Sequence, residues 1–160
     1  MFQGQMPSQS GDWYTPAWVF QMLGCRFALD VAAPPEGPRH VPCDFWISEG
    51  SLDERWYGFV WMNAPFGGRN GLTPWLEKFV AHGNGIALVP DRTSAPWFRD
   101  YARRVDIIAF LPKVKFERPD GTTGASPANG CALFGIGAKA VGALWNVDAD
   151  NGWIALPRSA

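Results

Sequence analysis

Four consecutive residues, Asn63, Ala64, Pro65 and Phe66, carry the groups needed to hold a planar heterocycle by an amine. They follow the apolar run 59–62, a pattern that predicts a short buried strand ending in a turn. The Asn63 side chain offers an acceptor oxygen. Pro65 keeps Ala64 extended, so that the Ala64 carbonyl offers a second acceptor. Phe66 offers a flat face on which a base can stack.

Hydrogen bonds from an aromatic amine to two fixed acceptors draw its nitrogen toward tetrahedral geometry and aim its lone pair. The segment 63–66 therefore predicts a site where a nucleobase amine acts as the nucleophile. A base inside a duplex would first have to be flipped out of the stack. On their own, the four residues are also typical of a strand-ending turn with a core phenylalanine.

A second segment, residues 27–33, predicts a buried strand with Asp30 near its end. The small residues that follow, Val31, Ala32 and Ala33, let the backbone approach a ligand closely. A carboxylate there can accept a hydrogen bond from an ammonium group or from a water bound to it. Open α/β sheets bind ligands beyond the carboxyl ends of their strands, so we expect residues at these ends to face a cleft.

Helical and strand patterns alternate along the chain, which predicts a compact, Rossmann-like α/β fold with a mostly parallel sheet. Thr15 and Thr73, each followed by proline, and Thr93 or Ser94 are the expected helix caps. No structure is assigned to 40–56 or to the tail. The predicted helices cover 16–23, 73–81 and about 93–103, and the predicted strands cover 27–33, 59–62, 85–89, 105–111 and 131–136, with 113–117 as a possible addition.

The length of 160 residues predicts one domain over residues 11–160, preceded by a flexible, polar segment 1–10. Three widely spaced cysteines and two histidines form no metal-ligand pattern, so no metal is expected. An odd cysteine count without a signal peptide predicts reduced thiols in a cytosol-like compartment. No apolar run approaches the roughly 20 residues of a membrane helix, so no membrane partner is expected.

The net charge of −1 excludes the overall basic excess that would by itself indicate nucleic-acid binding. DNA binding would have to use local cations, for which Arg69, Arg92, Lys113 and Lys115 are the candidates. The alternatives are a solvated side chain for Arg69, an ion pair with Asp91 for Arg92, and edge-strand charges that prevent aggregation for the two lysines.

The segment 63–66 resembles the Asp/Asn-Pro-Pro-Tyr/Phe motif of amino-group DNA methyltransferases. Together with the segments 12–16, 27–33, 87–90 and 93–98 it resembles the phage-type DNA N6-adenine methyltransferase family over residues 12–134. This resemblance implies S-adenosylmethionine as methyl donor, adenine N6 in DNA as acceptor, and a Rossmann-like fold. It also implies protection of phage DNA from restriction in the cytoplasm of a bacterial host.

The resemblance also assigns the cofactor residues. Tyr14, Thr15 and Pro16 match the segment whose Thr-Pro pair contacts the carboxylate end of the cofactor, and Asp30 with Ala32 stands where larger enzymes have a glycine-rich loop. For Thr15 a plain helix cap is an alternative, and both roles are compatible.

An acidic residue is expected to bind the adenosine of the cofactor. Residues 49–52 resemble an Asp-Gly-Leu segment of the family, which makes Glu49 the first candidate and Asp53 the second. For each of them a solvated loop acid is the alternative.

One residue departs from the family pattern, because Ala64 stands where proline is usual. The acceptor at this position is a backbone carbonyl, so we expect reduced or normal activity rather than none. A catalytically degenerate DNA-binding module of the same fold is the alternative function. Methylation of cytosine N4 is a third possibility, against which Asn63 argues, since serine would be expected there.

Overall fold

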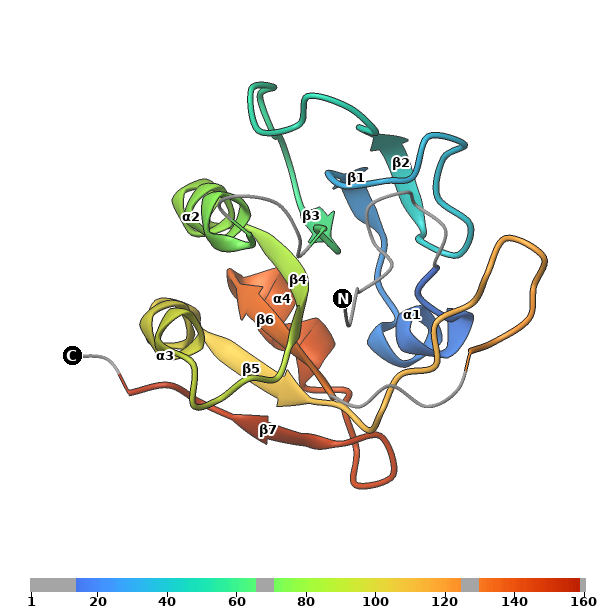
Figure 1. The fold of residues 1–160 in the computed structure, drawn as a ribbon. Helices are drawn as coiled ribbons and strands as arrows, with labels where there is room; N and C mark the ends of the chain where they lie inside the picture. The colour runs from blue at the N-terminus through green and yellow to red at the C-terminus, as the bar shows by residue number, and fades with distance from the viewer. Residues whose placement is uncertain (1–13, 66–70, 125–129, 159–160) are drawn as a thin grey trace.

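The computed structural model describes residues 14–65, 71–124 and 130–158. In this part of the chain one seven-stranded sheet, with strand order β2-β1-β3-β4-β6-β5-β7, lies between helices on its two faces (Figure 1). The strands are β1 (Phe27–Asp30), β2 (Cys43–Trp46), β3 (Val60–Met62), β4 (Gly85–Pro90), β5 (Ile107–Phe110), β6 (Cys131–Ile136) and β7 (Trp153–Ala155). The helices are α1 (Ala17–Leu23), α2 (Thr73–His82), α3 (Pro96–Ala102) and α4 (Ala138–Leu144).

The sheet is mixed. Strands β1, β2, β3 and β4 pair with one another in parallel, whereas β6 is antiparallel to both β4 and β5, and β7 is antiparallel to β5. The α/β class is thus confirmed, but the predicted mostly parallel arrangement holds only for β1 to β4. A parallel neighbour needs a crossover, usually a helix. The described residues between β5 and β6 contain no helix, so the chain returns antiparallel.

Two apolar clusters fill the space between the sheet and the helices. Along β4, Ile86 and Leu88 belong to the cluster under α1 and α4, and Ala87 and Val89 belong to the cluster under α2 and α3. This alternation follows from the two-residue period of a strand. All of β4 is buried, which explains why 85–89 has a continuous apolar sequence. The central strands are therefore held rigidly, and only their ends are available to a ligand.

Most predicted elements are confirmed within a few residues, but three were missed. Strand β2 has a largely exposed sequence, α4 contains Gly142 and lacks a capping signal, and β7 depends on stacking of Trp153 on Phe110 with ring centroids 4.2 Å apart. The prediction of a possible strand at 113–117 is wrong, because within this segment Glu117 alone makes β-bridges, and those bridges are isolated. Its backbone pairs with Tyr14, which ties the start of the described chain to this loop.

The predicted threonine and serine caps are wrong for all three helices. The N-cap positions are held by Pro16, Leu72 and Ala95, and none of these makes a side-chain capping bond. Proline at or beside the first helical turn already fixes φ in the helical range, so the helix start does not depend on a polar cap. The Thr15 hydroxyl is consequently available for another contact.

Candidate active site

A cavity of about 580 Å³ opens where β1, β2 and β3 end. These strands are parallel neighbours, so their carboxyl ends meet at one edge of the sheet. The chain leaves β1 for β2 on one side and later returns to β3 on the other. Such a reversal of strand order marks the ligand site of open α/β sheets. The volume is also in the range of small-molecule sites.

The cavity gathers residues from both predicted sites. The predicted residues that line it are Tyr14, Thr15, Asp30, Ala32, Glu49, Asn63, Ala64 and Pro65. Pro16 does not line it and is buried at the start of α1. Phe66 lies outside the described residues, so the predicted stacking ring has no structural account.

Asn63 follows the last residue of β3 and is half-buried. Its Nδ2 group donates a hydrogen bond of 3.1 Å to Oγ1 of Thr15. Because the amide nitrogen is used in this way, the side-chain oxygen is the group left to accept from a ligand. Ala64 and Pro65 continue the lining beside it, and Ala64 is only 3% exposed.

Asp30 ends β1 and is 3% exposed. Its Oδ1 accepts a bond of 3.1 Å from the Ala32 N–H, which is the one hydrogen bond to this carboxylate within the described residues. Burial raises the pKa of Asp30 to about 7, and the Ala32 bond offsets part of this rise. A desolvated carboxylate with spare acceptor capacity beside a cavity suits a cationic ligand group.

Two further acids reach the cavity from the loop that follows β2. Glu49 and Asp53 are both exposed and both line it. The buried Trp56 anchors this loop, because its Nε1 donates to the Ser51 carbonyl and hydroxyl at 3.0 Å. Lys78 of α2 also donates to the Leu52 carbonyl at 2.8 Å. The acids are thus carried by an anchored loop.

Charge in the cavity is predominantly negative. Among the described lining residues, Asp30, Glu49 and Asp53 are carboxylates, and Arg39 is the one guanidinium. That guanidinium donates to the carbonyls of Arg118 and Pro119 at 2.9 and 2.7 Å. Its charge is therefore directed toward the protein rather than toward a ligand, and the cavity favours cations over phosphates.

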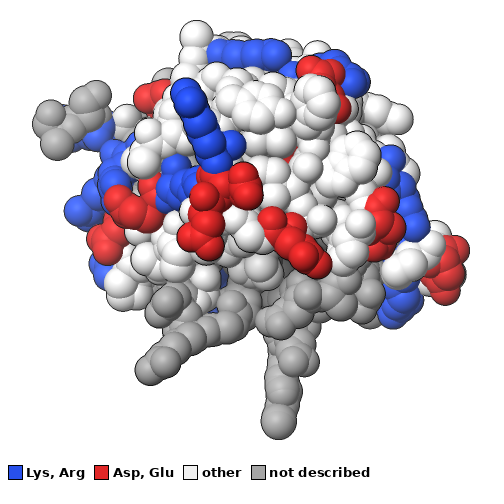
Figure 2. Space-filling model, turned by 90° about the horizontal axis from the view of Figure 1, so that it is seen from above, with Lys and Arg blue, Asp and Glu red and all other residues white. Residues whose placement is uncertain are grey.

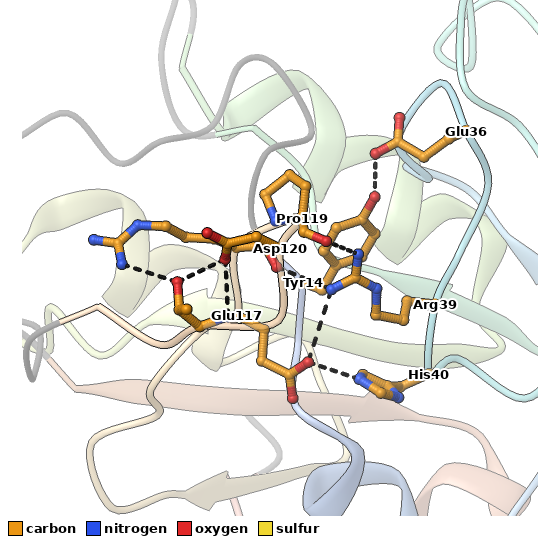
Figure 3. Close-up of polar contacts among 9 residues, drawn as sticks. Tyr14, Glu36, Arg39, His40, Glu117, Pro119 and Asp120 are labelled. Carbon is orange, nitrogen blue, oxygen red and sulfur yellow. Dashed lines mark hydrogen bonds and ion pairs between the residues drawn. The ribbon is translucent and has the colours of Figure 1, made fainter.

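One wall of the cavity is a polar network that joins three segments (Figure 3). The Arg39 guanidinium lies over the Tyr14 ring, 3.9 Å from its centroid, and the Tyr14 hydroxyl donates to Glu36. The Glu117 carboxylate lies between Arg39 and His40, with His40 Nε2 at 2.9 Å. Figure 3 shows these side chains linking the start of the described chain, the proline-rich loop after β1 and the loop after β5.

Sequence reasoning missed many lining residues, among them Arg39, His40, Trp75 and Phe116. Trp75 had a usable signal, because it lies in the first turn of the helix that follows the 63–66 segment. Arg39 and His40 follow Asp30 by about ten residues in an irregular loop, where no periodicity indicates direction. Phe116 reaches the cavity through a contact distant in sequence, which a single sequence does not reveal.

The same chain segments are matched by a known family. The family model described as DNA N-6-adenine-methyltransferase (Dam) matches residues 3–137, which is most of the chain and includes every lining residue of the cavity. The chain belongs to this family. No curated protein and no solved structure matches it significantly. Membership confirms the suspected resemblance and implies DNA adenine methylation as the general activity.

A member of a DNA-modifying family must also contact the nucleic acid, and none of the predicted cations that the structure describes lines the cavity. Arg92 is exposed beyond β4 and lines a separate, open hollow formed by residues 91–95. Lys113 and Lys115 are exposed in the loop that leads to Phe116. Arg69 lies outside the described residues. On the face in Figure 2, blue and red side chains are interspersed and form no continuous basic band among the coloured residues.

None of the helices in residues 14–65, 71–124 and 130–158 is both long and apolar enough for a membrane span. No group of three or more histidine, cysteine, aspartate or glutamate side chains in these ranges is arranged to hold a metal ion.

Proposed function

We propose that this protein transfers a methyl group from S-adenosylmethionine to N6 of adenine in DNA. One observation carries the proposal: Asn63 and Asp30, an amide and a buried carboxylate from adjacent parallel strands, open into one cavity at the reversal of strand order. An amide acceptor suits a neutral amine, and a carboxylate suits a cation. The cavity therefore offers one group for the methyl acceptor, Asn63, and one for the cationic methyl donor, Asp30.

On the acceptor side, the Asn63 oxygen and the Ala64 carbonyl take the two hydrogens of the adenine amine. Ala64 precedes Pro65, so its backbone is confined to extended conformations and its carbonyl direction is limited. Holding the amine in line with the methyl group supplies much of the rate enhancement, because both reactants are then fixed in position. The proton leaves after transfer, so the site needs no strong general base.

On the donor side, the cavity fits a ligand with two positive charges. S-adenosylmethionine supplies a methyl group on a sulfonium, and it also carries an ammonium group. Asp30 accepts from the ammonium group or from a water bound to it, Ala32 allows close approach, and Glu49 accepts from the adenosine hydroxyls. Thr15 and Tyr14 border the end of the cavity at which the cofactor carboxylate is expected.

The proposal includes the architecture and the setting. Five of the seven described strands run in the same direction, and the cavity lies at the reversal of strand order, which supports a trimmed Rossmann-like fold. Residues 11–160 act as one domain, and no metal is required. The setting is a phage or prophage enzyme that protects DNA from restriction in the bacterial cytoplasm, a role supported by the resemblance to phage-type enzymes.

The test is direct. Purified protein is incubated with unmethylated plasmid and S-adenosylmethionine, and the DNA is digested to nucleosides and analysed for N6-methyl-2′-deoxyadenosine by mass spectrometry. Asn63→Ala should abolish the product and leave the cofactor Kd nearly unchanged, because Asn63 serves the acceptor. Asn151→Ala is the matched control, since the Asn151 amide bonds Asp148 in a loop that does not line the cavity.

The outcomes separate the alternatives. Cofactor binding without any methylated nucleoside would favour the degenerate DNA-binding module. N4-methyl-2′-deoxycytidine in place of N6-methyl-2′-deoxyadenosine would identify the cytosine amine as the methyl acceptor. Equal turnover of wild type and Asn63→Ala would remove Asn63 from the site, and the absence of cofactor binding would remove the whole proposal.

A further inference from the structure

Thr15 was expected to cap a helix or to contact the cofactor, but its hydroxyl is occupied by a different group. Oγ1 accepts the 3.1 Å hydrogen bond from Nδ2 of Asn63, across 48 residues of sequence. Thr15 is only 5% exposed, so water has little access to replace this partner. The two residues come from the segment before α1 and from the end of β3, and both line the cavity.

The orientation of the Asn63 amide decides whether the acceptor site can work. An asparagine amide has an accepting oxygen on one side and a donating NH₂ group on the other. Only the oxygen can accept a hydrogen bond from the substrate amine. If the NH₂ group took its place, two hydrogen-bond donors would face each other. In the working orientation the NH₂ group points away from the substrate and needs an acceptor, because a buried donor without one is costly.

We infer that Thr15 is a positioning residue for methyl transfer: its hydroxyl accepts from Asn63 Nδ2 and thereby holds Oδ1 toward the amine that is methylated. Thr15 does not touch the reacting atoms in this role and acts through Asn63. The inference rests on the proposed function and names a residue that sets the geometry of that site. It also gives a reason why the first described segment is tied into the cavity wall through Tyr14, beside Thr15.

The experiment compares Thr15→Val, which keeps the shape and removes the acceptor, with Thr15→Ser, which keeps the hydroxyl. Steady-state kinetics with unmethylated DNA should show kcat lower by about 10- to 100-fold in Thr15→Val, the size expected when a buried N–H loses its partner. Thr15→Ser should restore most of this loss. The cofactor Kd of Thr15→Val should rise far less than kcat falls, although Thr15 borders the cofactor end of the cavity, and saturable cofactor binding also shows that the variant is folded.

The Asn63→Asp variant provides a second background, which isolates the effect of Thr15 on the orientation of the Asn63 amide. In Asn63→Asp the side chain has two equivalent oxygens and no NH₂ group, so it needs no acceptor to choose an orientation. Adding Thr15→Val to Asn63→Asp should therefore cost much less in kcat than adding it to wild type, which is a double-mutant cycle with clear coupling. If Thr15→Val proves unstable, Thr15→Ala takes its place in the same comparison.

The results distinguish this inference from the proposed function. Equal fold losses in the two backgrounds, or an unchanged kcat in Thr15→Val, would overturn the positioning role while wild type still methylates adenine. A large rise in cofactor Kd with unchanged kcat would also overturn it, because Thr15 would then be a cofactor contact. If wild type itself makes no N6-methyl-2′-deoxyadenosine, the proposed function fails, whatever the role of Thr15.

Discussion

The buried carboxylate of Asp30 makes a prediction that combines stability and function. Asp30 is 3% exposed, and burial raises its pKa to about 7 from an ordinary value of 3.8. The folded protein therefore holds the Asp30 proton more tightly than the unfolded chain between these two pH values. By linkage, the contribution of Asp30 to stability falls as pH rises from about 4 to about 7 and stays low above that.

The magnitude follows from the interval between the two pKa values. At 1.36 kcal/mol for each pH unit, an interval from 3.8 to about 7 corresponds to about 4 kcal/mol of lost stability at pH 8. Asp30→Asn has no charge to desolvate and can still accept from the Ala32 N–H. It should therefore be more stable than wild type by up to about 4 kcal/mol at pH 8 and by about 2 kcal/mol at pH 5.

Urea denaturation followed by tryptophan fluorescence at pH 5, 6, 7 and 8 measures this difference, with nine tryptophans as probes. The matched control is Asp53→Asn, an exposed acid of the same cavity, which should change stability by less than about 0.5 kcal/mol. Asp30→Asn should also lose at least about tenfold in cofactor affinity, because a charge-assisted hydrogen bond is removed. A variant that is no more stable than wild type at pH 8, or whose advantage does not grow with pH, would refute the desolvation argument.

Three further predictions concern the rest of the site. Glu49→Gln should weaken cofactor binding by about 3- to 30-fold and Asp53→Asn by less, as titration calorimetry would show, if Glu49 bonds the adenosine. Ala64→Pro should raise kcat at unchanged cofactor Kd, because it stiffens the acceptor loop; a lower kcat would show that rigidity is not limiting. Replacing Lys113 and Lys115 together by alanine should reduce the slope of log Kd for DNA against log salt by about 2; an unchanged slope would leave both lysines as ordinary surface charges.

The central strands could be predicted because strands that are buried on both faces have a continuous apolar sequence. Segments 85–89 and 131–136 are apolar throughout, and in the fold both of their faces are covered by helices. Strand β2 could not be predicted in this way, since it is an edge strand with exposed Phe45 and Trp46. Its structure comes from backbone pairing with β1, to which side-chain periodicity gives no clue.

The site could be predicted as far as each residue follows a strand. Asp30 and Asn63 were found in this way, because a polar side chain after an apolar run indicates the ligand edge of an α/β sheet. The contacts among these segments could not be found. The bond between Thr15 and Asn63 spans 48 residues, and the pairing of His40 with Glu117 spans 77. Contacts between residues so far apart in sequence depend on the topology of the whole sheet, which no local sequence pattern reveals.

The charge of the cavity also bears on how a nearly neutral protein holds DNA. Asp30, Glu49 and Asp53 oppose the approach of phosphates while the cavity is empty, and the proposed cofactor, with a sulfonium and an ammonium group, would offset them when bound. The DNA Kd should therefore be lower with the cationic analogue sinefungin than with S-adenosylhomocysteine, which lacks the second positive charge. Fluorescence anisotropy at low salt would measure a difference of a few fold, reduced at high salt by screening. Equal DNA affinities in the two complexes would show that the charge of the cavity acids does not affect DNA binding. If the difference is found, loss of the sulfonium charge on methyl transfer itself weakens the hold on DNA and favours release of the product.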